Sequence, residues 1–302
     1  MKITIDLDKL LEEGKVNQAE YDKFSQFSAR ETATLAFNIL IGFGVIAVSG
    51  ATLALLPTPL TAMAVGLMIG TLGIGLFSMS QDQWLVLANI CIVVGALLFG
   101  GGVIAAGEGS VGSFLLVAMA FAGAGVFVQS ALLTVLAVLA LSSCLGARTA
   151  YFHATYFLGI KEPTLTVALF TLMSVTTYQV SQRLAANYQR IALAASRTAV
   201  FLVNFGFWIG SLWGDRMESG EIVIADWVFS ALWAIALIVT GVWAWQRNRR
   251  WLINVVAVFG AIHFYTQWFE RLGASEETVL MAGLLALGFA IGLRALNVKL
   301  GG

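Results

Sequence analysis

Charged residues are scarce in this chain of 302 residues. Asp, Glu, Lys and Arg make up only 11% of the sequence, and the formal net charge is zero. Between Thr32 and Gly146 only Asp82 and Glu108 are charged. Soluble domains carry about 25% charged residues, so this composition excludes an ordinary soluble domain. The lack of a basic excess also argues against a nucleic-acid partner.

Cysteine and histidine are almost absent as well. Cys91 and Cys144 both lie inside apolar segments, where a small buried side chain is the expected role. Neither His153 nor His263 has an acidic residue three or four positions away. The sequence contains no phosphate-binding loop and no Cys/His metal spacing. It therefore predicts neither a cofactor nor a metal site, and an enzyme is disfavoured.

Apolar residues, in contrast, make up 59% of the chain and recur in stretches of sufficient length to cross a bilayer. About 20 apolar residues span a hydrocarbon core of roughly 30 Å as a helix. The sequence thus predicts an all-α, polytopic transmembrane helical bundle that has the lipid bilayer as a partner. Ten spans are predicted near residues 34–56, 60–80, 84–106, 111–128, 130–145, 164–181, 191–213, 226–245, 251–269 and 277–297.

Loop signals separate most of these spans. Pro57 and Pro59 end the first, and the glycine-rich stretch 107–112 ends the third. Residues 111–146 allow two readings, either two short spans around Gln129 and Ser130 or one long helix. The loop 147–163 carries the aromatic stretch YFHATYFLGI, which is expected to lie along the membrane surface.

The distribution of Lys and Arg favours ten spans over nine. With ten, twelve basic residues lie on the N-terminal side and four on the other, whereas nine spans give nine against seven. Because cytoplasmic loops are enriched in Lys and Arg, both termini are expected in the cytoplasm of a bacterial inner (plasma) membrane protein. Two five-span halves, 32–146 and 147–302, would make any repeat an inverted one, although no similarity between the halves is evident in the sequence.

A short charged segment, residues 1–31, precedes the membrane domain 32–302 and is predicted to form a cytoplasmic helical hairpin. Gly14 is a plausible end for the first helix, and Asn17 with Glu20 forms a capping-box pattern for the second. Ser28 and Glu31 repeat that pattern, which predicts a new helix at the first span, with one continuous helix as the alternative. The segment is acidic and lacks an apolar core, so no secretory signal is expected there.

The hairpin is too small to bury its own apolar residues. It must therefore pack on the membrane domain, on the lipid surface or on another chain, and a protein partner is one candidate. The residues expected to form this docking face are Leu7, Leu10, Leu11, Tyr21 and Phe24.

Both ends of the chain resemble one protein family. A leucine-bearing helix followed by EEGKVNQAEYDKF, and a C-terminal RNRRWLINVVAVFGAIHFYTQWFERL before a glycine-rich last span, are similar to the bacterial membrane proteins grouped as domain-of-unknown-function family 2157. The middle of the chain matches by hydropathy only. This resemblance implies an architecture and no particular chemistry.

Polar residues within the spans are candidates for function because they are costly in hydrocarbon. His263 and Glu270 lie seven residues apart on one helix face and could form a polar, proton-carrying surface. The alternative is that His263 bonds to a neighbouring helix while Glu270 lies among the headgroups. Arg197 is expected to extend to the headgroups.

Other features of the spans point to helix packing. The asparagines Asn38, Asn89 and Asn204 are expected to form hydrogen bonds between helices. Gly66 and Gly70 form a GxxxG motif, which predicts tight packing within one chain.

Two functions remain open from the sequence. The favoured one is a structural or accessory membrane protein whose hairpin recruits a partner. The alternative is a secondary transporter of a small solute, which His263 and Glu270 could couple to protons, since about ten spans with cytoplasmic termini also resemble the drug/metabolite transporters. A transporter is expected to bury polar groups in both halves, and the first half offers only Asn38 and Asn89.

Overall fold

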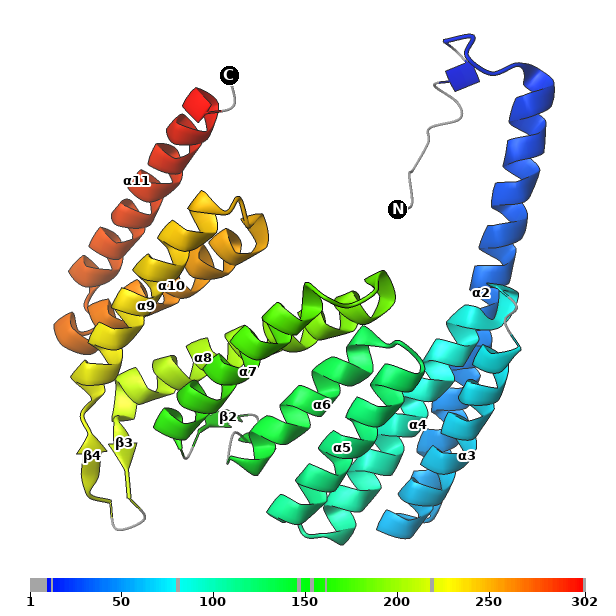
Figure 1. Ribbon diagram of the computed structural model, residues 1–302, viewed down its shortest axis with the longest axis horizontal. Helices are drawn as coiled ribbons and strands as arrows, with labels where there is room; N and C mark the ends of the chain where they lie inside the picture. Colours follow the sequence, from blue (N-terminus) through cyan, green and yellow to red (C-terminus); the bar gives the residue numbers. More distant parts are fainter. Residues whose placement is uncertain are drawn as a thin grey trace. The chain divides into compact units, whose positions relative to one another are not determined.

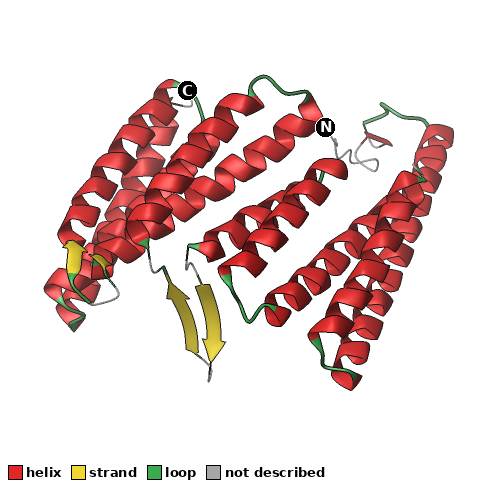
Figure 2. Cartoon of the chain, turned by 60° about the horizontal axis from the view of Figure 1, so that its bottom comes forward, coloured by secondary structure: helices red, strands yellow, loops and turns green. Residues whose placement is uncertain are grey.

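The computed structural model of the chain describes residues 10–11, 13–79, 82–145, 148–152, 155–160, 162–217 and 220–300. Over these residues the fold is all-α, as the composition predicts. Ten helices, α2 to α11, hold nearly all of the regular structure, and the strands described form two short antiparallel hairpins (Figure 1, Figure 2).

The chain divides into two compact units, which are described separately. The first comprises Met1–Cys144 with Arg183–Ala195, and the second comprises Leu145–Gln182 with Ser196–Gly302. Both are built from helices joined by short turns.

The first unit contains five long helices. Thr58 caps α3 because its side chain accepts the Thr61 amide hydrogen bond at 3.1 Å, and Pro59 occupies the first helical position. After the third predicted span, Glu108 and Gly109 take positive φ angles of 51° and 68°, which turns the chain sharply. The helices are α2 (Gln18–Leu55), α3 (Pro59–Ser78), α4 (Leu85–Ala106), α5 (Val111–Phe127) and α6 (Ala131–Cys144), with a single 3₁₀ turn η1 (Asp82–Trp84) before α4.

The second unit contains α7 and most of α8, followed by three further helices. Two strand pairs, β1 with β2 and β3 with β4, lie in the loops. The elements are β1 (Arg148–Phe152), β2 (Thr155–Gly159), α7 (Pro163–Ser181), α8 (Ala186–Trp213), β3 (Asp215–Arg216), β4 (Ile222–Ile224), α9 (Asp226–Gln246), α10 (Arg250–Leu272) and α11 (Glu276–Leu300).

Each predicted span falls on a helix, and the bounds agree within a few residues except that α2 begins well before the first span, at Gln18. Among the residues that the structure describes, six segments are long and apolar enough to cross a membrane, judged by length and composition: Thr34–Leu55, α3, α4, α8, α9 and α10. These are the helices of a multi-pass membrane protein. Residues 111–146 form two helices, α5 and α6, of 17 and 14 residues. Both are shorter than the roughly 20 residues of an upright span, so the count of ten crossings stays a prediction.

The predicted restart of a helix at Ser28 was wrong, and the alternative of one continuous helix holds. The chain does not begin a new helix at Ser28, because α2 runs without a break from Gln18 to Leu55. The loop 147–163 is more regular than expected, since β1 and β2 pair antiparallel with Tyr151 opposite Tyr156. Aromatic and β-branched residues favour such strands, so the aromatic stretch carries a strand signal as well as an interfacial one.

Glycines bring α3 and α4 into backbone contact. A Cβ built on Gly95 would lie 2.4 Å from the amide nitrogen of Gly70 and 2.7 Å from the carbonyl oxygen of Gly66. A Cβ on Gly66 would lie 2.4 Å from the amide nitrogen of Phe99. Only glycine fits at these positions. The GxxxG motif therefore packs within the chain, as predicted.

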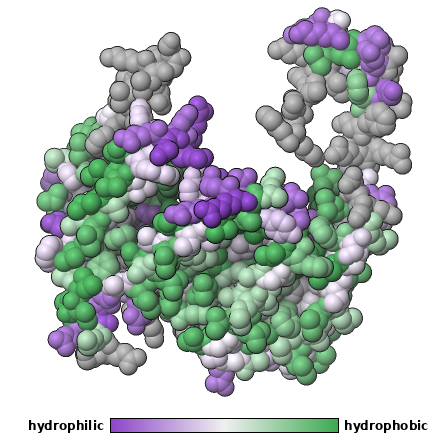
Figure 3. Space-filling model, viewed as in Figure 1, coloured by the Kyte–Doolittle hydropathy of each residue, from purple (hydrophilic) through white to green (hydrophobic). Residues whose placement is uncertain are grey.

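The outward sides of the helices carry large exposed apolar side chains, among them Leu40, Phe43, Met68, Ile238 and Trp245. Figure 3 shows apolar residues over the sides of the helices and hydrophilic residues at the N-terminal hairpin and at helix ends. A soluble protein rarely exposes so much apolar surface, whereas lipid chains would cover it.

Candidate functional site

The N-terminal hairpin turns through two capping motifs. At the end of the first helix, the Gly14 amide donates to the Leu11 carbonyl at 3.0 Å and the Lys15 amide to the Leu10 carbonyl at 2.9 Å. Gly14 has a φ of 66°, so it ends the helix as predicted. Asn17 and Glu20 then form the predicted capping box, with reciprocal hydrogen bonds of 2.8 and 3.0 Å.

The predicted docking residues lie at the far end of α2 from Leu55 (Figure 1). Leu10, Leu11 and Tyr21 are half-buried, Phe24 is 48% exposed, and Leu7 lies outside the described residues. Within the first unit, α3 and α4 lie beside the later part of α2 only. The sixteen residues between Gln18 and the apolar span at Thr34 would extend about 24 Å as a helix.

A buried polar cluster joins α8, α9 and α10. The Trp233 side chain is fully buried, and its indole nitrogen donates to the Asn204 side-chain oxygen at 2.9 Å. The Trp208 indole donates to the Thr266 hydroxyl at 3.0 Å. Asn204 thus bonds between helices, as predicted. We call these residues, with His263 and Gln267, the indole cluster.

His263 is held within the indole cluster by Trp233. The centroids of the two rings are 4.8 Å apart, in an edge-to-face arrangement. The Nδ1 atom of His263 and the Nε2 atom of Gln267 are both buried without a hydrogen-bond partner among the described residues. They lie one helical turn apart on α10. A buried acceptor and a buried donor so close in the chain could be bridged by one small polar molecule.

Glu270 does not take part in this cluster. It lies two turns beyond His263 on the same side of α10 and is exposed, and no hydrogen bond or ion pair joins the two residues in the described structure. Gln267, which the sequence analysis missed, is closer to His263. The signal was present, because His263, Thr266 and Gln267 recur at a helical spacing of three and four in an apolar span.

The remaining predicted residues divide between helix packing and helix ends. Asn38 is buried and donates to the Gln83 carbonyl at 2.5 Å, so it bonds to another segment. Asn89 instead donates to Leu85 of its own helix at 2.7 Å, and the predicted interhelical bond is wrong there. Cys91 is fully buried, as expected for a small apolar side chain.

Cys144 lies near the end of α6. It is partly buried, and its sulfur faces the Val111 and Ala140 carbonyl oxygens at 3.8 and 3.6 Å. It thus contacts backbone rather than a second thiol, and both cysteines are free.

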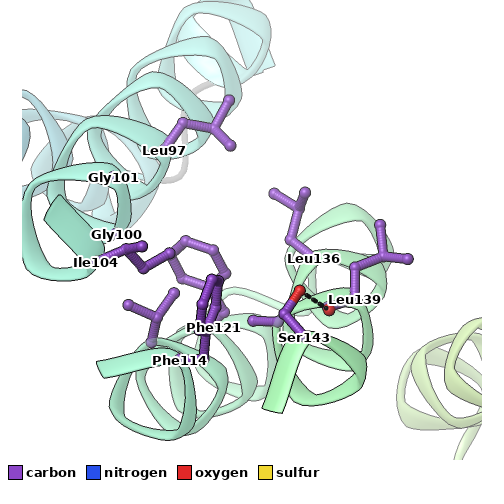
Figure 4. A pocket seen from close by; sticks show the side chains of 11 residues that line it. Leu97, Gly100, Gly101, Ile104, Phe114, Phe121, Leu136, Leu139 and Ser143 are labelled. Carbon is purple, nitrogen blue, oxygen red and sulfur yellow. Dashed lines mark hydrogen bonds between the residues drawn. The ribbon is translucent and has the colours of Figure 1, made fainter. Parts of the chain in front are cut away.

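The first unit contains an open apolar cavity of about 290 Å³ between α4, α5 and α6 (Figure 4). Phe114, Phe121, Leu97 and Leu136 line it. Its one polar side chain, Ser143, donates its hydroxyl to the Leu139 carbonyl of the same helix at 3.1 Å. The cavity therefore offers no polar group for recognising a solute.

Comparisons with protein-family models, with curated proteins and with solved structures found no match. In the described part of the chain no three His, Cys, Asp or Glu side chains are close enough to hold a metal ion.

Proposed function

We propose that this chain is a membrane-anchored docking protein whose N-terminal hairpin binds a partner protein in the water next to the membrane. The observation that carries the proposal is the continuity of α2. One helix includes both the second arm of the capped hairpin and the apolar span Thr34–Leu55. The hairpin is thereby held at a fixed direction and distance from the membrane, which suits a site for another protein.

The charge of the hairpin favours a protein over lipid as its partner. Residues 1–31 contain seven acidic and five basic side chains, a net charge of −2. Anionic headgroups would repel such a segment. The helices of the first unit do not cover Phe24 either, since it is 48% exposed. The partner that fits best is a soluble protein presenting an apolar helix face to Leu10, Leu11 and Phe24.

The count of basic residues supports the orientation of this site. Twelve Lys and Arg residues on the N-terminal side against four on the other favour cytoplasmic termini under the positive-inside rule. We infer that the hairpin lies on the cytoplasmic side of a bacterial inner membrane. The resemblance to domain-of-unknown-function family 2157, which rests on the sequence motifs at both ends, implies the same order of a hairpin followed by membrane spans.

The test is crosslinking in intact membranes followed by purification of the tagged chain. Leu10→Asp with Phe24→Asp should reduce the captured partner about tenfold or more, because two apolar side chains would no longer be buried. Lys15→Asp is the matched control, since it adds a carboxylate to the exposed turn and leaves the apolar face intact. Full capture by the double variant, at equal membrane abundance, would refute the proposal.

A second function, transport of a small solute, is favoured by one observation. His263 Nδ1 and Gln267 Nε2 are buried in a candidate membrane span with no hydrogen-bond partner in the described part of the chain, a cost that a bound polar solute or a carried proton would offset. In proteoliposomes, His263→Leu and Gln267→Leu should each abolish any proton flux of the purified chain, while Glu270→Gln should leave it unchanged. Flux that survives both leucine variants would remove this alternative.

A further inference from the structure

Four arginines lie together at one end of the second unit. Arg197 is on α8, Arg247 and Arg249 lie in the turn after α9, and Arg250 begins α10. All four are exposed. We call them the arginine end.

Two of these arginines are positioned by aromatic rings. The guanidinium carbon of Arg197 lies 5.1 Å from the Trp251 ring centroid, and that of Arg249 lies 5.9 Å from the Tyr178 ring centroid. Trp243 in turn packs edge-on against Tyr178 at 6.3 Å. A guanidinium stacked on a ring keeps its N–H donors at the edge, free to bind an anion. Arg197 is also brought to the level of the first turn of α10, as expected for a side chain that extends to the headgroups.

The turn that carries Arg247 and Arg249 is fixed by its backbone. The Arg249 amide donates to the Ala244 carbonyl at 2.9 Å, and the Asn248 amide donates to the Trp245 carbonyl at 3.1 Å. Asn248 has a φ of 52°, a left-handed conformation that asparagine tolerates better than most residues. The position of Arg249 is therefore set before any ligand arrives.

No described carboxylate neutralises the arginine end. The described acidic residues of the second unit all lie at or beyond the opposite ends of the helices, about 30 Å away for a helix of 20 residues. They are Glu162, Asp215, Glu221, Asp226, Glu270, Glu276 and Glu277. The counter-charge must come from outside the described residues.

We propose that the arginine end binds the phosphate group of an anionic phospholipid, with Arg197 and Arg249 as its positioned donors. Guanidinium groups bind phosphate oxygens through two parallel N–H bonds. An exposed apolar stripe runs along α9 toward the arginine end. Its residues, at helical spacing, are Ile235, Ile238, Val242 and Trp245. Acyl chains would lie along this stripe, whereas a free phosphate would contact the arginines alone.

The experiment is a lipid titration of the purified full-length chain in a non-ionic detergent, followed by native mass spectrometry and thermal unfolding. Phosphatidylglycerol should bind at least about tenfold more tightly than phosphatidylcholine, because each Arg near a headgroup contributes roughly a factor of five. Arg197→Gln with Arg249→Gln should remove most of that preference. Arg216→Gln with Arg271→Gln is the matched control, since it removes the same charge at the opposite helix ends and should change the preference less than about twofold.

Three results would overturn the proposal. The first is equal binding of the two lipids, and the second is an equal loss in the control variant, which would indicate general charge attraction. The third is a thermal shift by inorganic phosphate as large as that by phosphatidylglycerol, which would identify a soluble anion as the ligand. If the double Gln variant fails to fold, Arg197→Lys with Arg249→Lys keeps the charge and should lose the preference only in part, since the paired N–H donors are gone.

Discussion

In the first unit α3 and α4 meet through glycine backbone, whereas in the second unit α8, α9 and α10 meet through indole rings and side-chain hydrogen bonds. Gly66, Gly70 and Gly95 let two backbones touch. In the second unit Trp233 fills the space between helices, together with Phe259 and the aromatic residues around it. Eight of the nine tryptophans lie in the second unit, so the difference is already present in composition.

The polar side chains follow this division in part, because the indole N–H groups and one serine of the second unit bond between helices. In the first unit most buried hydroxyl groups bond to their own helix, as Ser49 does to the Val45 carbonyl at 2.5 Å. In the second unit Ser181 and Ser211 also bond to their own helices, but Ser196 crosses from α8 to the Ser174 carbonyl of α7 at 3.0 Å. Close backbone packing needs no polar partner, but packing through bulky indoles leaves N–H groups that must find acceptors. The difference teaches that two ways of joining apolar helices coexist in one chain.

The largest effect is expected from emptying the indole cluster. Trp233→Ala should lower the free energy of unfolding by about 3–5 kcal/mol, because it leaves a large cavity and removes the indole N–H that donates to Asn204. Unfolding in mixed micelles of non-ionic detergent and SDS would measure the change. The control is Trp227→Ala on the same helix, where the side chain is 62% exposed and the expected loss is about 0.5 kcal/mol. Similar losses from both would show that the cluster does not hold the second unit together.

The second largest effect is expected from a substitution that disrupts the glycine contact between α3 and α4. Gly95→Ala should destabilise by about 1–3 kcal/mol, because its methyl group would meet the backbone of Gly70, which cannot rotate away. Gly101→Ala lies on the same helix with open space around it, so it should be neutral or stabilise by up to about 1 kcal/mol. The same unfolding assay decides between them. An equal response to the two alanines would mean that α3 and α4 are further apart than described.

A smaller effect is expected from the hydrogen bond within the indole cluster. A double-mutant cycle with Trp233→Phe and Asn204→Leu should give a coupling energy of about 0.6–1.7 kcal/mol, the range for bonds between membrane helices. The cycle separates the hydrogen bond from the loss of ring volume. Strict additivity of the two single variants would argue against a bond between the Trp233 indole and Asn204.

The smallest difference compares two serines. Ser196→Ala removes a bond between α7 and α8 and should cost about 0.6 kcal/mol. Ser49→Ala removes only a bond within α2, so its effect on unfolding should be near zero. Thermal unfolding of both variants in one detergent would test this pair. A larger loss for Ser49→Ala would reverse the proposed division between the units.

Much of the helical framework follows from local residues alone. Helix ends are marked by Thr58 with Pro59, by the glycines around Glu108, and by Asn17 with Glu20. Such ends can be predicted from sequence because capping depends on groups within a few positions of each other. Apolar length predicts ten spans, of which six coincide with described segments that are long and apolar enough to cross a membrane. The all-α class therefore comes directly from the sequence, whereas residues 111–146 allowed one helix or two and the structure has two.

Other features depend on what the folded chain brings together. The S-x-x-E pattern at Ser28 does not restart a helix, because residues 25–34 contain no Gly or Pro and the backbone stays helical through them. From the sequence, Asn89 and Asn204 are equally expected to form hydrogen bonds between helices. Only Asn204 accepts one, from an indole on another helix, whereas Asn89 bonds within its own helix. Helix periodicity gives the face on which a side chain lies but not its neighbour across the gap. Residue pattern alone thus determined most helix ends and the spacing of Gln267 from His263 on one helix. Tertiary packing decided that Trp233 of another helix lies against His263, and that rings position Arg197 and Arg249.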